Sequence, residues 1–412
     1  MQRPIAISLS PNTQKDDILL ALKTLFRPIQ WFNFRHTEKL EKETAKLFGK
    51  EYWALAVNSG RSALYLILKS LDVSVTDKIA LQGFTCIAVP NSVLWAGARP
   101  IYIDVDESFN LDPKDLSKKV DSNTKAVIVQ HAFGTPAAVD EIKKVAKKNN
   151  LYIIEDGAVS MGAKYKGKKV GTLGDIAFFS FGRDKVISSV FGGMIVGKDK
   201  RAYEKIKEMR DALDYPSPLW FLQQLIHPLA FSVILPLYNL GLGKLTVGKI
   251  MLFVLQKMKL LSRAVCKEEE SSIKPSHFPK KMPGGLSILA LNQIKKIEKF
   301  NTHRVEIAKY YDTAIDKNKF KIQEKKPGSI YLRYSIVTDS RDTLLRRSKK
   351  KGMLLGDWYR KVVVPAKDFY TVGYSKGDCP KAEEYAEKTI NLPTYPNFTL
   401  KDAKKVVEVI NE

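Results

Sequence analysis

Short apolar runs alternate with longer helix-like runs through the first half of the chain. Runs rich in β-branched and aromatic residues, bounded by turn residues, lie at 78–82, 99–106, 125–131, 151–156, 176–181 and 192–197. Residues 61–71 have the composition of a buried helix, and residues 140–150 have the spacing of an amphipathic one. Because the strand-like runs are apolar at nearly every position, both faces of the sheet must be covered. The alternation predicts an α/β fold with a mainly parallel sheet between helices.

The last third of the chain has a different pattern. Residues 286–315 predict one long helix, 329–337 a strand, and 379–390 and 401–410 two further helices. A polar stretch at 266–285 precedes them and predicts a linker. A chain of 412 residues is long enough for two domains. We therefore expect a large domain at 1–285 and a small C-terminal α+β domain at 286–412.

A long apolar segment, residues 215–262, interrupts this pattern. Its first part, 215–243, contains no Asp, Glu, Lys or Arg, and lysines such as Lys249 and Lys257 follow. The length would allow a membrane-spanning helix, but Pro228 and Pro236 would interrupt it. The pattern slightly favours one or two short helices that lie in a membrane interface with lysines at the headgroups. An insertion packed on the core or at a subunit contact is the alternative.

Charge and cysteine content narrow the choice of partners and compartment. The chain has 68 Lys and Arg against 44 Asp and Glu, a net charge of +24, which favours anionic partners or reflects a solvated lysine-rich surface. Because zinc-finger spacing and RNP-like motifs are missing from the sequence, nucleic acid is not expected. Three scattered cysteines argue against a disulfide framework or a structural zinc ion. Without an apolar leader in the first residues, we expect a cytoplasmic protein.

The stretch FGGMIVGKDK, residues 191–200, has the spacing of a nucleotide-binding phosphate loop. Asp199, however, stands where that loop needs Ser or Thr to bind magnesium. The residues between the glycines include Met-Ile-Val, which is typical of a buried strand and not of an exposed turn. We therefore predict a strand followed by a turn, with Lys198 a solvated turn lysine.

Three other segments carry candidate chemistry. NSGRSAL, residues 58–64, predicts a helix start that could bind phosphate, or an ordinary capped helix. Glu155 and Asp156 end an apolar strand, where a carboxylate would face a ligand crevice or cap a loop. Lys185 follows another buried strand and could be a desolvated amine nucleophile or a solvated surface lysine.

Taken in order, these segments resemble one family. The motifs S-G-x-x-A-L, E-D-x-A-x-x-x-G-A-x-Y-x-G-K-x-V-G-x-x-G-D and F-S-F-x-x-x-K-x-x-x-x-x-x-G-G are similar to those of the DegT/DnrJ/EryC1/StrS family. The resemblance extends from about residue 34 to residue 410, apart from the apolar segment. It implies a pyridoxal-phosphate (PLP) enzyme of fold type I, the aspartate-aminotransferase fold, with a sheet of the seven-stranded type.

The resemblance also implies roles for single residues. Lys185 matches the lysine that binds the cofactor as a Schiff base and shuttles the proton. Asp156 matches the carboxylate that keeps the pyridinium nitrogen protonated, which makes the ring an electron sink. The cofactor phosphate would be bound by Gly60, Arg61, Ser62 and Ser180.

The sequence departs from the family pattern at several cofactor positions. Val159 replaces the usual Gln or His, and Cys86 replaces the usual aromatic residue that stacks on the ring. Residues 279–282 read PKKM where the family commonly has N-x-R-M, which supplies contacts from a second subunit. His131 lies in a segment that lines the family's pocket, and either contacts substrate or is a hydrogen-bonded histidine without chemistry.

The resemblance implies transfer of an amino group, from glutamate, to a keto carbon of a nucleotide-activated sugar for cell-surface polysaccharide or glycan synthesis. It also implies a homodimer, and the apolar segment suggests peripheral attachment to the inner face of the cytoplasmic membrane. One alternative is another PLP reaction on a sugar. The family's dehydratases have a histidine in place of the lysine, so Lys185 argues against that reaction. A membrane-associated regulatory or scaffolding protein without turnover is the other alternative.

Overall fold

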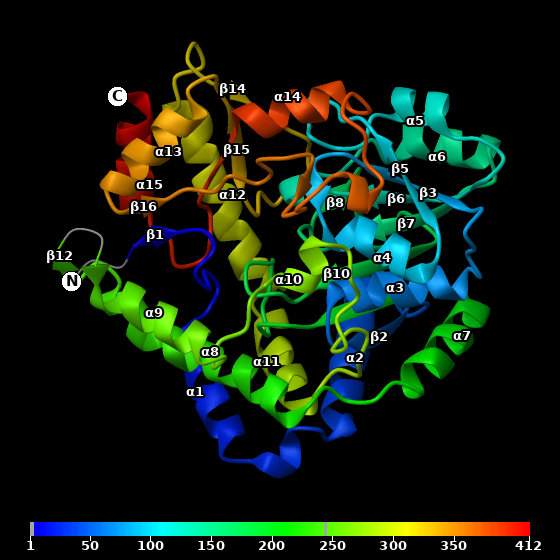
Figure 1. Ribbon diagram of the computed structural model, residues 1–412, viewed down its shortest axis with the longest axis horizontal. Coiled ribbons are helices and arrows are strands. Elements are labelled where there is room, and N and C mark those ends of the chain that lie inside the picture. Colours follow the sequence, from blue (N-terminus) through cyan, green and yellow to red (C-terminus); the bar gives the residue numbers. More distant parts are fainter. Residues whose placement is uncertain (1–3, 243–244) are drawn as a thin grey trace.

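The computed structural model describes residues 4–242 and 245–412 and contains a seven-stranded sheet (Figure 1). Its order is β2-β11-β10-β7-β6-β3-β5. The bounds are β2 (Trp53–Val57), β11 (Gly193–Gly197), β10 (Ile176–Ser180), β7 (Tyr152–Asp156), β6 (Thr124–Gln130), β3 (Lys78–Gln82) and β5 (Arg99–Ile103). From β10 to β5 all pairings are parallel, whereas β11 is antiparallel to both β10 and β2. The predicted mainly parallel sheet is confirmed, and FGGMIVGKDK contains a strand of it.

Helices cover both faces of this sheet. Alternation along β2 is typical: Leu55 and Val57 pack with helices of one face, while Ala54 and Ala56 pack with those of the other. The first face is covered by α3 (Gly60–Ser70), α4 (Ala88–Ala96) and α7 (Lys200–Asp211). The second is covered by α2 (Phe34–Phe48), α5 (Pro113–Lys119), α6 (Val139–Lys148) and α11 (Gly284–Ile294).

The C-terminal part has its own core around a three-stranded antiparallel sheet, β14-β15-β18. Its elements are α12 (Ile297–Ala314), β14 (Lys321–Ile322), β15 (Tyr334–Val337), α13 (Arg341–Lys350), β18 (Thr389–Leu392) and α15 (Leu400–Asn411), whereas α14 (Pro380–Lys388) packs with the first face of the large sheet. The single helix predicted over 286–315 was wrong, because the chain bends at Lys295–Lys296. Before the bend, α11 packs on α1 (Lys15–Leu25) and α2, and after it α12 joins the C-terminal core. The domain boundary at 285/286 stays a prediction.

Short strand pairs tie distant segments together. β1 (Ile5–Ala6) pairs with β16 (Met353–Leu354), and β4 (Thr85–Cys86) pairs with β17 (Val363–Val364). The hairpins β8 (Lys164–Tyr165) with β9 (Lys168–Lys169) and β12 (Gly241–Leu242) with β13 (Leu245–Thr246) are local. The described residues also contain three 3₁₀ turns, η1 (Pro28–Gln30), η2 (Ala132–Gly134) and η3 (Tyr370–Val372).

The apolar segment forms two helices, α8 (Pro218–Leu237) and α9 (Val247–Lys257). The expectation that prolines confine it to short helices was wrong for α8, which continues through Pro228 and Pro236. Burial explains this result, because eight side chains of α8 are buried, among them Phe221 and Leu225. Residues 243 and 244 of the predicted segment 215–262 lie outside the described residues. The predicted linker 266–285 also contains structure, the short helix α10 (Lys267–Glu270).

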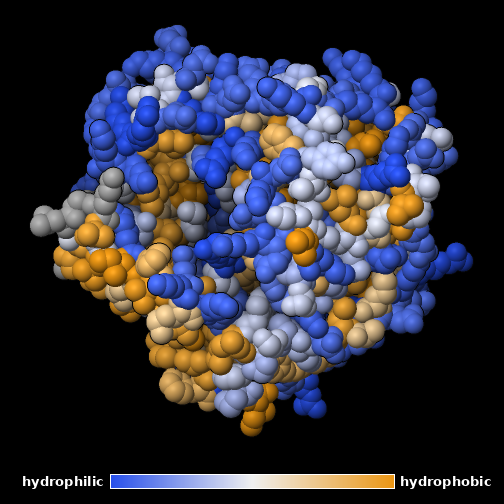
Figure 2. Space-filling view, viewed as in Figure 1, coloured by the Kyte–Doolittle hydropathy of each residue, from blue (hydrophilic) through white to orange (hydrophobic). Residues whose placement is uncertain are grey.

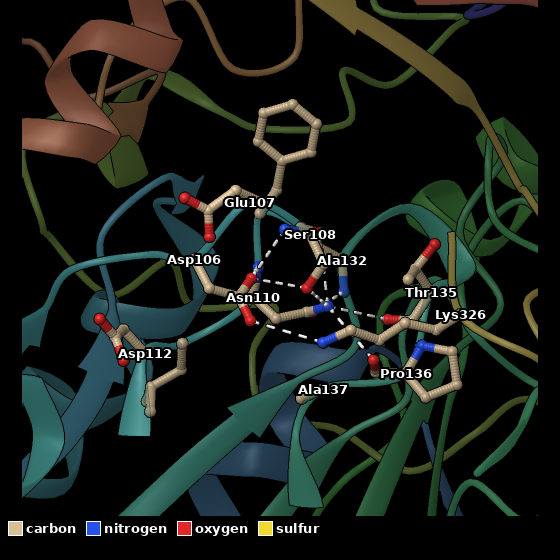
Figure 3. A network of polar contacts seen from close by, with 12 residues as sticks. Asp106, Glu107, Ser108, Asn110, Asp112, Ala132, Thr135, Pro136, Ala137 and Lys326 are labelled. Carbon is tan, nitrogen blue, oxygen red and sulfur yellow. Dashed lines mark hydrogen bonds and ion pairs between the residues drawn. The ribbon is translucent and has the colours of Figure 1, made fainter. Parts of the chain in front are cut away.

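The loops that follow the parallel strands are fixed by buried polar side chains. Figure 3 shows the network around Asn110, which lies after β5 and points toward the loop after β6. Its amide nitrogen donates to the carbonyl of Thr135 at 3.2 Å, and its side-chain oxygen accepts from the amide of Ala132 at 2.7 Å. Lys326, from the C-terminal part, reaches Asp106 in the same network at 3.4 Å. The sheet edge that carries the strand ends is therefore fixed in shape.

Gly193, at the start of β11, allows the closest backbone approach in this region. A Cβ atom there would lie 2.2 Å from the carbonyl oxygen of Ser59, which no real contact permits. We expect Gly193→Ala to lower the free energy of unfolding by more than about 2 kcal/mol, because β11 and the start of α3 must separate. Urea unfolding measures the loss. Gly97→Ala is the control: its φ is +99° but its Cβ would meet no atom within 4 Å, so we expect only about 1 kcal/mol. Equal losses would contradict the prediction.

Candidate active site

The carboxyl ends of the parallel strands open into a cavity of about 380 Å³. Parallel strands place their carboxyl ends at one edge, so residues far apart in sequence meet there. Of the residues singled out in the sequence, the cavity is lined by Gly60, Arg61, Cys86, Asp156, Val159, Ser180 and Lys185. Ser62 and His131 are not among the lining residues. The structure thus brings together seven of the nine predicted positions.

Asp156 ends β7 and is 3% exposed. Its Oδ1 accepts a hydrogen bond from the amide of Ala158 at 2.9 Å. Burial raises the pKa of this carboxyl above its ordinary value, while that hydrogen bond and the charges of Lys185 and His131 act in the opposite direction. A charge at this position is therefore costly unless a further cation binds beside it.

Glu155, the neighbour of Asp156, points to the other face of the strand. Its Oε1 accepts from the amides of Leu173 at 2.5 Å and Gly174 at 2.7 Å, and its Oε2 accepts from Gly171 at 2.8 Å. Glu155 is 1% exposed and has a structural role, because it fixes the loop at 171–174. The sequence offered two interpretations of the acidic pair, a ligand-facing carboxylate and a loop cap. In the structure Asp156 lines the cavity and Glu155 caps a loop.

Lys185 follows β10 and its side chain enters the cavity, with Nζ 5.1 Å from the ring centroid of Trp358. The backbone around it is held by two buried side chains. Asn12 donates to the carbonyl of Lys185 and, at 3.2 Å, to that of Val186. Arg304 of α12 donates to the same Val186 carbonyl at 2.9 Å and to Asn12 at 3.1 Å. The lysine is thus presented from a rigid turn.

The start of α3 forms another wall. Ser59 caps the helix, since its Oγ accepts from the amide of Ser62 at 3.1 Å. A Cβ at Gly60 would lie 2.9 Å from the Cβ of Ser180, so the helix start and the end of β10 are in close contact. The hydroxyl of Ser62 donates to Asn58 at 2.8 Å and is buried behind the helix start. Ser59, Gly60, Arg61 and Ser180 therefore line the cavity, whereas Ser62 does not.

Arg61 has a side chain that the sequence analysis placed at a phosphate. In the structure its guanidinium is paired with Glu269 of α10, donates to the carbonyl of Ala264 at 3.0 Å and lies 4.8 Å from the ring centroid of Phe278. The side chain of Glu269 is 1% exposed and that of Arg61 is 12% exposed. Arg61 therefore lines the cavity, but its charge is partly neutralised by Glu269, which lies in the predicted linker 266–285.

Arg183 is a second arginine that lines the cavity, besides Arg61 and Lys185, and it was not predicted from the sequence. Its guanidinium donates to the carbonyl and the hydroxyl of Ser262, both at 2.8 Å. Burial lowers its pKa to about 10, while the charge of Asp184 acts in the opposite direction and that of Arg61 in the same direction. A charged guanidinium held beside another cation favours an anionic ligand in this part of the cavity.

Two of the positions that depart from the family pattern, Val159 and Cys86, also line the cavity, whereas residues 279–282 do not. Val159 is buried, and Cys86 is half-buried, with the pKa of its thiol raised by burial. In place of N-x-R-M, the backbone of Lys280 bonds with Asn58, next to the start of α3. Lys281 lies over the ring of Tyr215 at 5.8 Å. The stretch therefore lies beside the same helix start.

His131 is fully buried, and both of its ring nitrogens have partners. Nε2 lies 3.2 Å from Glu155 Oε2, and Nδ1 accepts from the amide of Ala137 at 3.1 Å. These contacts agree with the second alternative for His131, a hydrogen-bonded histidine without chemistry. They offer no free atom of the ring to a substrate in the cavity.

Trp358 and Arg333 were also missed. The Arg333 guanidinium lies 3.2 Å from the ring centroid of Trp358 and 3.4 Å from a carboxylate oxygen of Asp184, the neighbour of Lys185. Trp358 in turn forms a wall of the cavity beside Lys185. In the sequence Trp358 stands beside Tyr359 in a stretch without helix or strand periodicity. That pair was the only signal, and without periodicity it could not be placed at the site.

The raised pKa of Asp156 predicts how stability depends on pH in protein freed of small molecules. Between the ordinary value of 3.8 and the raised folded value, the folded state binds more protons than the unfolded state. Stability therefore falls as pH rises through this window. We expect the stability of the wild type relative to Asp156→Asn to fall as pH rises above about 4 and then to level off. Thermal unfolding across pH measures it.

Asp121→Asn is the matched control for this pH series. The Lys78 ammonium holds the pKa of Asp121 below its usual range, so the advantage of the wild type over this variant should grow with pH. If the two variants gave slopes of the same sign, the assignment of a raised pKa to Asp156 would be overturned.

The buried pair of Arg61 and Glu269 gives a second prediction. Glu269→Gln leaves a largely buried guanidinium without its counter-ion, so we expect a loss of about 3 kcal/mol in the free energy of unfolding. Glu268→Gln, an exposed neighbour on the same helix, should change it by less than about 0.5 kcal/mol. Urea unfolding of both variants compares the two positions, and equal effects would show that the pair contributes nothing.

Comparisons with known proteins agree with the geometry. An uncharacterized protein of Methanocaldococcus jannaschii is 30% identical over 385 residues, which cover 91% of this chain and 88% of the relative. A GDP-perosamine synthase of Escherichia coli O157:H7 is 39% identical over 171 residues, 41% of this chain and about half (47%) of that enzyme. The solved structure of Helicobacter pylori PseC, an aminotransferase involved in the biosynthesis of pseudoaminic acid, has a TM-score of 0.77 at 21% identity and covers 99% of this chain and 98% of its own.

The family comparison covers nearly all of the chain outside the apolar segment. The DegT/DnrJ/EryC1/StrS aminotransferase family matches residues 12–212 and 255–411. The unmatched stretch between them contains α8. The fold is that of fold type I aminotransferases, as the sequence motifs predict. The chain is a member of the DegT/DnrJ/EryC1/StrS family of sugar aminotransferases.

Proposed function

We propose that this enzyme transfers an amino group from glutamate to a keto carbon of a nucleotide-linked sugar, with PLP bound in the cavity. One observation carries the proposal: a single cavity joins the amine of Lys185, the buried carboxylate of Asp156 and the start of α3 beside Ser180. These are an amine, an acid and a phosphate site, which the cofactor requires together.

The residues present fit the cofactor in charge as well as in shape. The backbone amides at the start of α3 and the hydroxyl of Ser180 would hold the phosphate, and Gly60 leaves room for close approach. The cost of a buried charge on Asp156 would be offset by a protonated ring nitrogen, which is the missing cation. Val159 and Cys86 would flank the ring with apolar and polarizable surface in place of an aromatic stack.

When bound, PLP supplies an electron sink for the electrons of a broken C–H bond. Lys185 is the group of this chain that would bind the cofactor and move the proton at the substrate carbon through its Nζ. Its rigid turn, held by Asn12 and Arg304, keeps that atom in place. Asp156 would keep the ring nitrogen protonated through a charge-assisted hydrogen bond.

The cations of the cavity support an anionic substrate. Arg183, and the edge of Arg61 that lines the cavity, would attract a diphosphate, and the flat ring of Trp358 offers a surface to a sugar or base. The partial match to an enzyme named for GDP-perosamine supports a nucleotide-linked sugar. We further propose a homodimer, in which residues 279–282 lie near the second site, and a cytoplasmic enzyme held at a membrane surface by the segment 215–262.

Replacement of the lysine tests the proposal. With PLP added, the wild type should show the visible absorption band of bound cofactor, and glutamate should bleach it. Lys185→Ala should lose the band and reduce the rate of amino transfer by at least about a thousandfold, because the nucleophile and the proton carrier are both gone. Absorbance spectra and mass spectrometry of keto-sugar products measure the two effects.

Lys198→Ala is the matched control, because that lysine lies on the surface turn after β11, 53% exposed, 3.2 Å from Glu51. It should keep both the band and the rate. A Lys185→Ala enzyme that still aminated sugars would overturn the assignment. A wild type whose band glutamate does not bleach would favour a regulatory protein without turnover. A screen of nucleotide-linked keto sugars with glutamate then identifies the substrate.

A further inference from the structure

The exposed apolar side chains of the described residues are concentrated on one part of the surface. Thirteen of the 17 large hydrophobic residues that are exposed lie in residues 15–29 and 218–258, among them Phe26, Ile29, Leu245 and Phe253. We call this surface the apolar face. Figure 2 shows it as orange along the lower-left margin, over α9 and α8 and down to α1. An exposed patch of this extent marks an interaction site.

The helices of the apolar face are layered, with α9 on α8 and α8 on α1. Along α9 and its C-cap the exposed residues Val247, Ile250, Val254 and Met258 recur every three or four positions, and Leu19, Leu22 and Phe26 do so along α1 and its C-cap. Each helix thus carries a stripe of apolar side chains that no described residue covers, parallel to its own axis. Such stripes suit a partner that is itself flat and apolar.

The charge of this region points to an anionic partner. Residues 215–267 contain no Asp or Glu, while Lys249, Lys257, Lys259, Arg263 and Lys267 lie among or beside the apolar positions. Most of these basic side chains are exposed, and Lys23 and Arg27 extend the rim along α1. A rim that is basic around an apolar centre is complementary to the interface of an anionic bilayer, where lysines reach the headgroups.

Two other occupants fit less well. Helix α8 is long and apolar enough to cross a membrane, but 44% of that window is buried in the protein. His227 on its inner side is bonded to Ser10 at 2.6 Å, so the helix belongs to the fold. A second copy of the chain would bring the same patch against itself in a two-fold interface, and the acid-free segments would then repel each other.

We propose that the apolar face of α1, α8 and α9 docks on an anionic lipid bilayer. The helices lie flat in the headgroup region, with the stripes of α1 and α9 in the acyl boundary and the basic rim at the phosphates. Among the described residues, none of this face lines the active-site cavity. The inference therefore stands or fails separately from the proposed chemistry.

Vesicle binding tests the proposal. The full-length protein should sediment with vesicles of phosphatidylcholine and phosphatidylglycerol, and salt should weaken this binding. Phe253→Ser in α9 and Phe26→Ser after α1 should each lower the partition coefficient by about tenfold, because each removes a large apolar side chain from the interface. Both side chains are exposed, at 65% and 77%, so the thermal unfolding temperature should not change.

Tyr370→Ser is the matched control, an 88% exposed aromatic on η3, which contacts α4 away from the apolar face. It should bind vesicles as the wild type does. Three outcomes would overturn the proposal: a wild type that ignores anionic vesicles, equal binding to vesicles of phosphatidylcholine alone, or equal effects of all three substitutions. A second copy would be the occupant if the wild type ignored vesicles and Phe253→Ser turned a dimer into a monomer in light scattering. Aminotransferase activity in solution, measured on the same variants, should stay at the wild-type level throughout.

Discussion

The close passage of β11 behind the Ser59 carbonyl is the contact around which the active site is arranged. Because position 193 has no side chain, β11 can lie between β2 and β10 and bring the start of α3 against Ser180. The start of α3, Ser180 and the turn that carries Lys185 then line one cavity with Asp156 from β7. A pair of glycines that resembles part of a nucleotide loop thus serves packing, because it lets β11 lie against the start of α3, which is far away in the sequence.

The cavity and the apolar segment are connected through residues 262–269. Ser262 fixes the guanidinium of Arg183, and Glu269 fixes that of Arg61, so both arginines are oriented by a segment that enters from outside the sheet. The family match is interrupted just before this segment, between residues 212 and 255. Residues 262–269 themselves lie inside the matched part, so the backbone leads from the unmatched helix α8 to the residues that orient the two arginines. The backbone that leaves the apolar segment thus continues directly into the residues that hold Arg183 and Arg61 at the cavity.

The sequence predicted elements whose burial is local and missed contacts that depend on the whole fold. The strands at 78–82 and 192–197 were predicted within one residue, because apolar runs between turns need little context. The helix over 286–315 was predicted as continuous because no Gly or Pro marks the bend that two separate cores impose. Glu269 lies 208 residues from Arg61, and no local pattern links them. The prolines of α8 predicted a break that does not occur, because the burial of the helix outweighs the low helix propensity of proline.

The N-terminal segment shows how misleading chain position can be as a guide to importance. Residues 4–13 form hardly any regular structure, and a protein engineer would trim them or attach a tag to them. Yet Asn12 holds the carbonyl of Lys185 and is itself held by Arg304 from α12. Hydrogen bonds therefore join three distant segments, represented by Asn12, Lys185 and Arg304, at one turn. Shortening the chain through residue 12 would therefore loosen the turn that carries Lys185, besides removing Ser8 from the cavity wall.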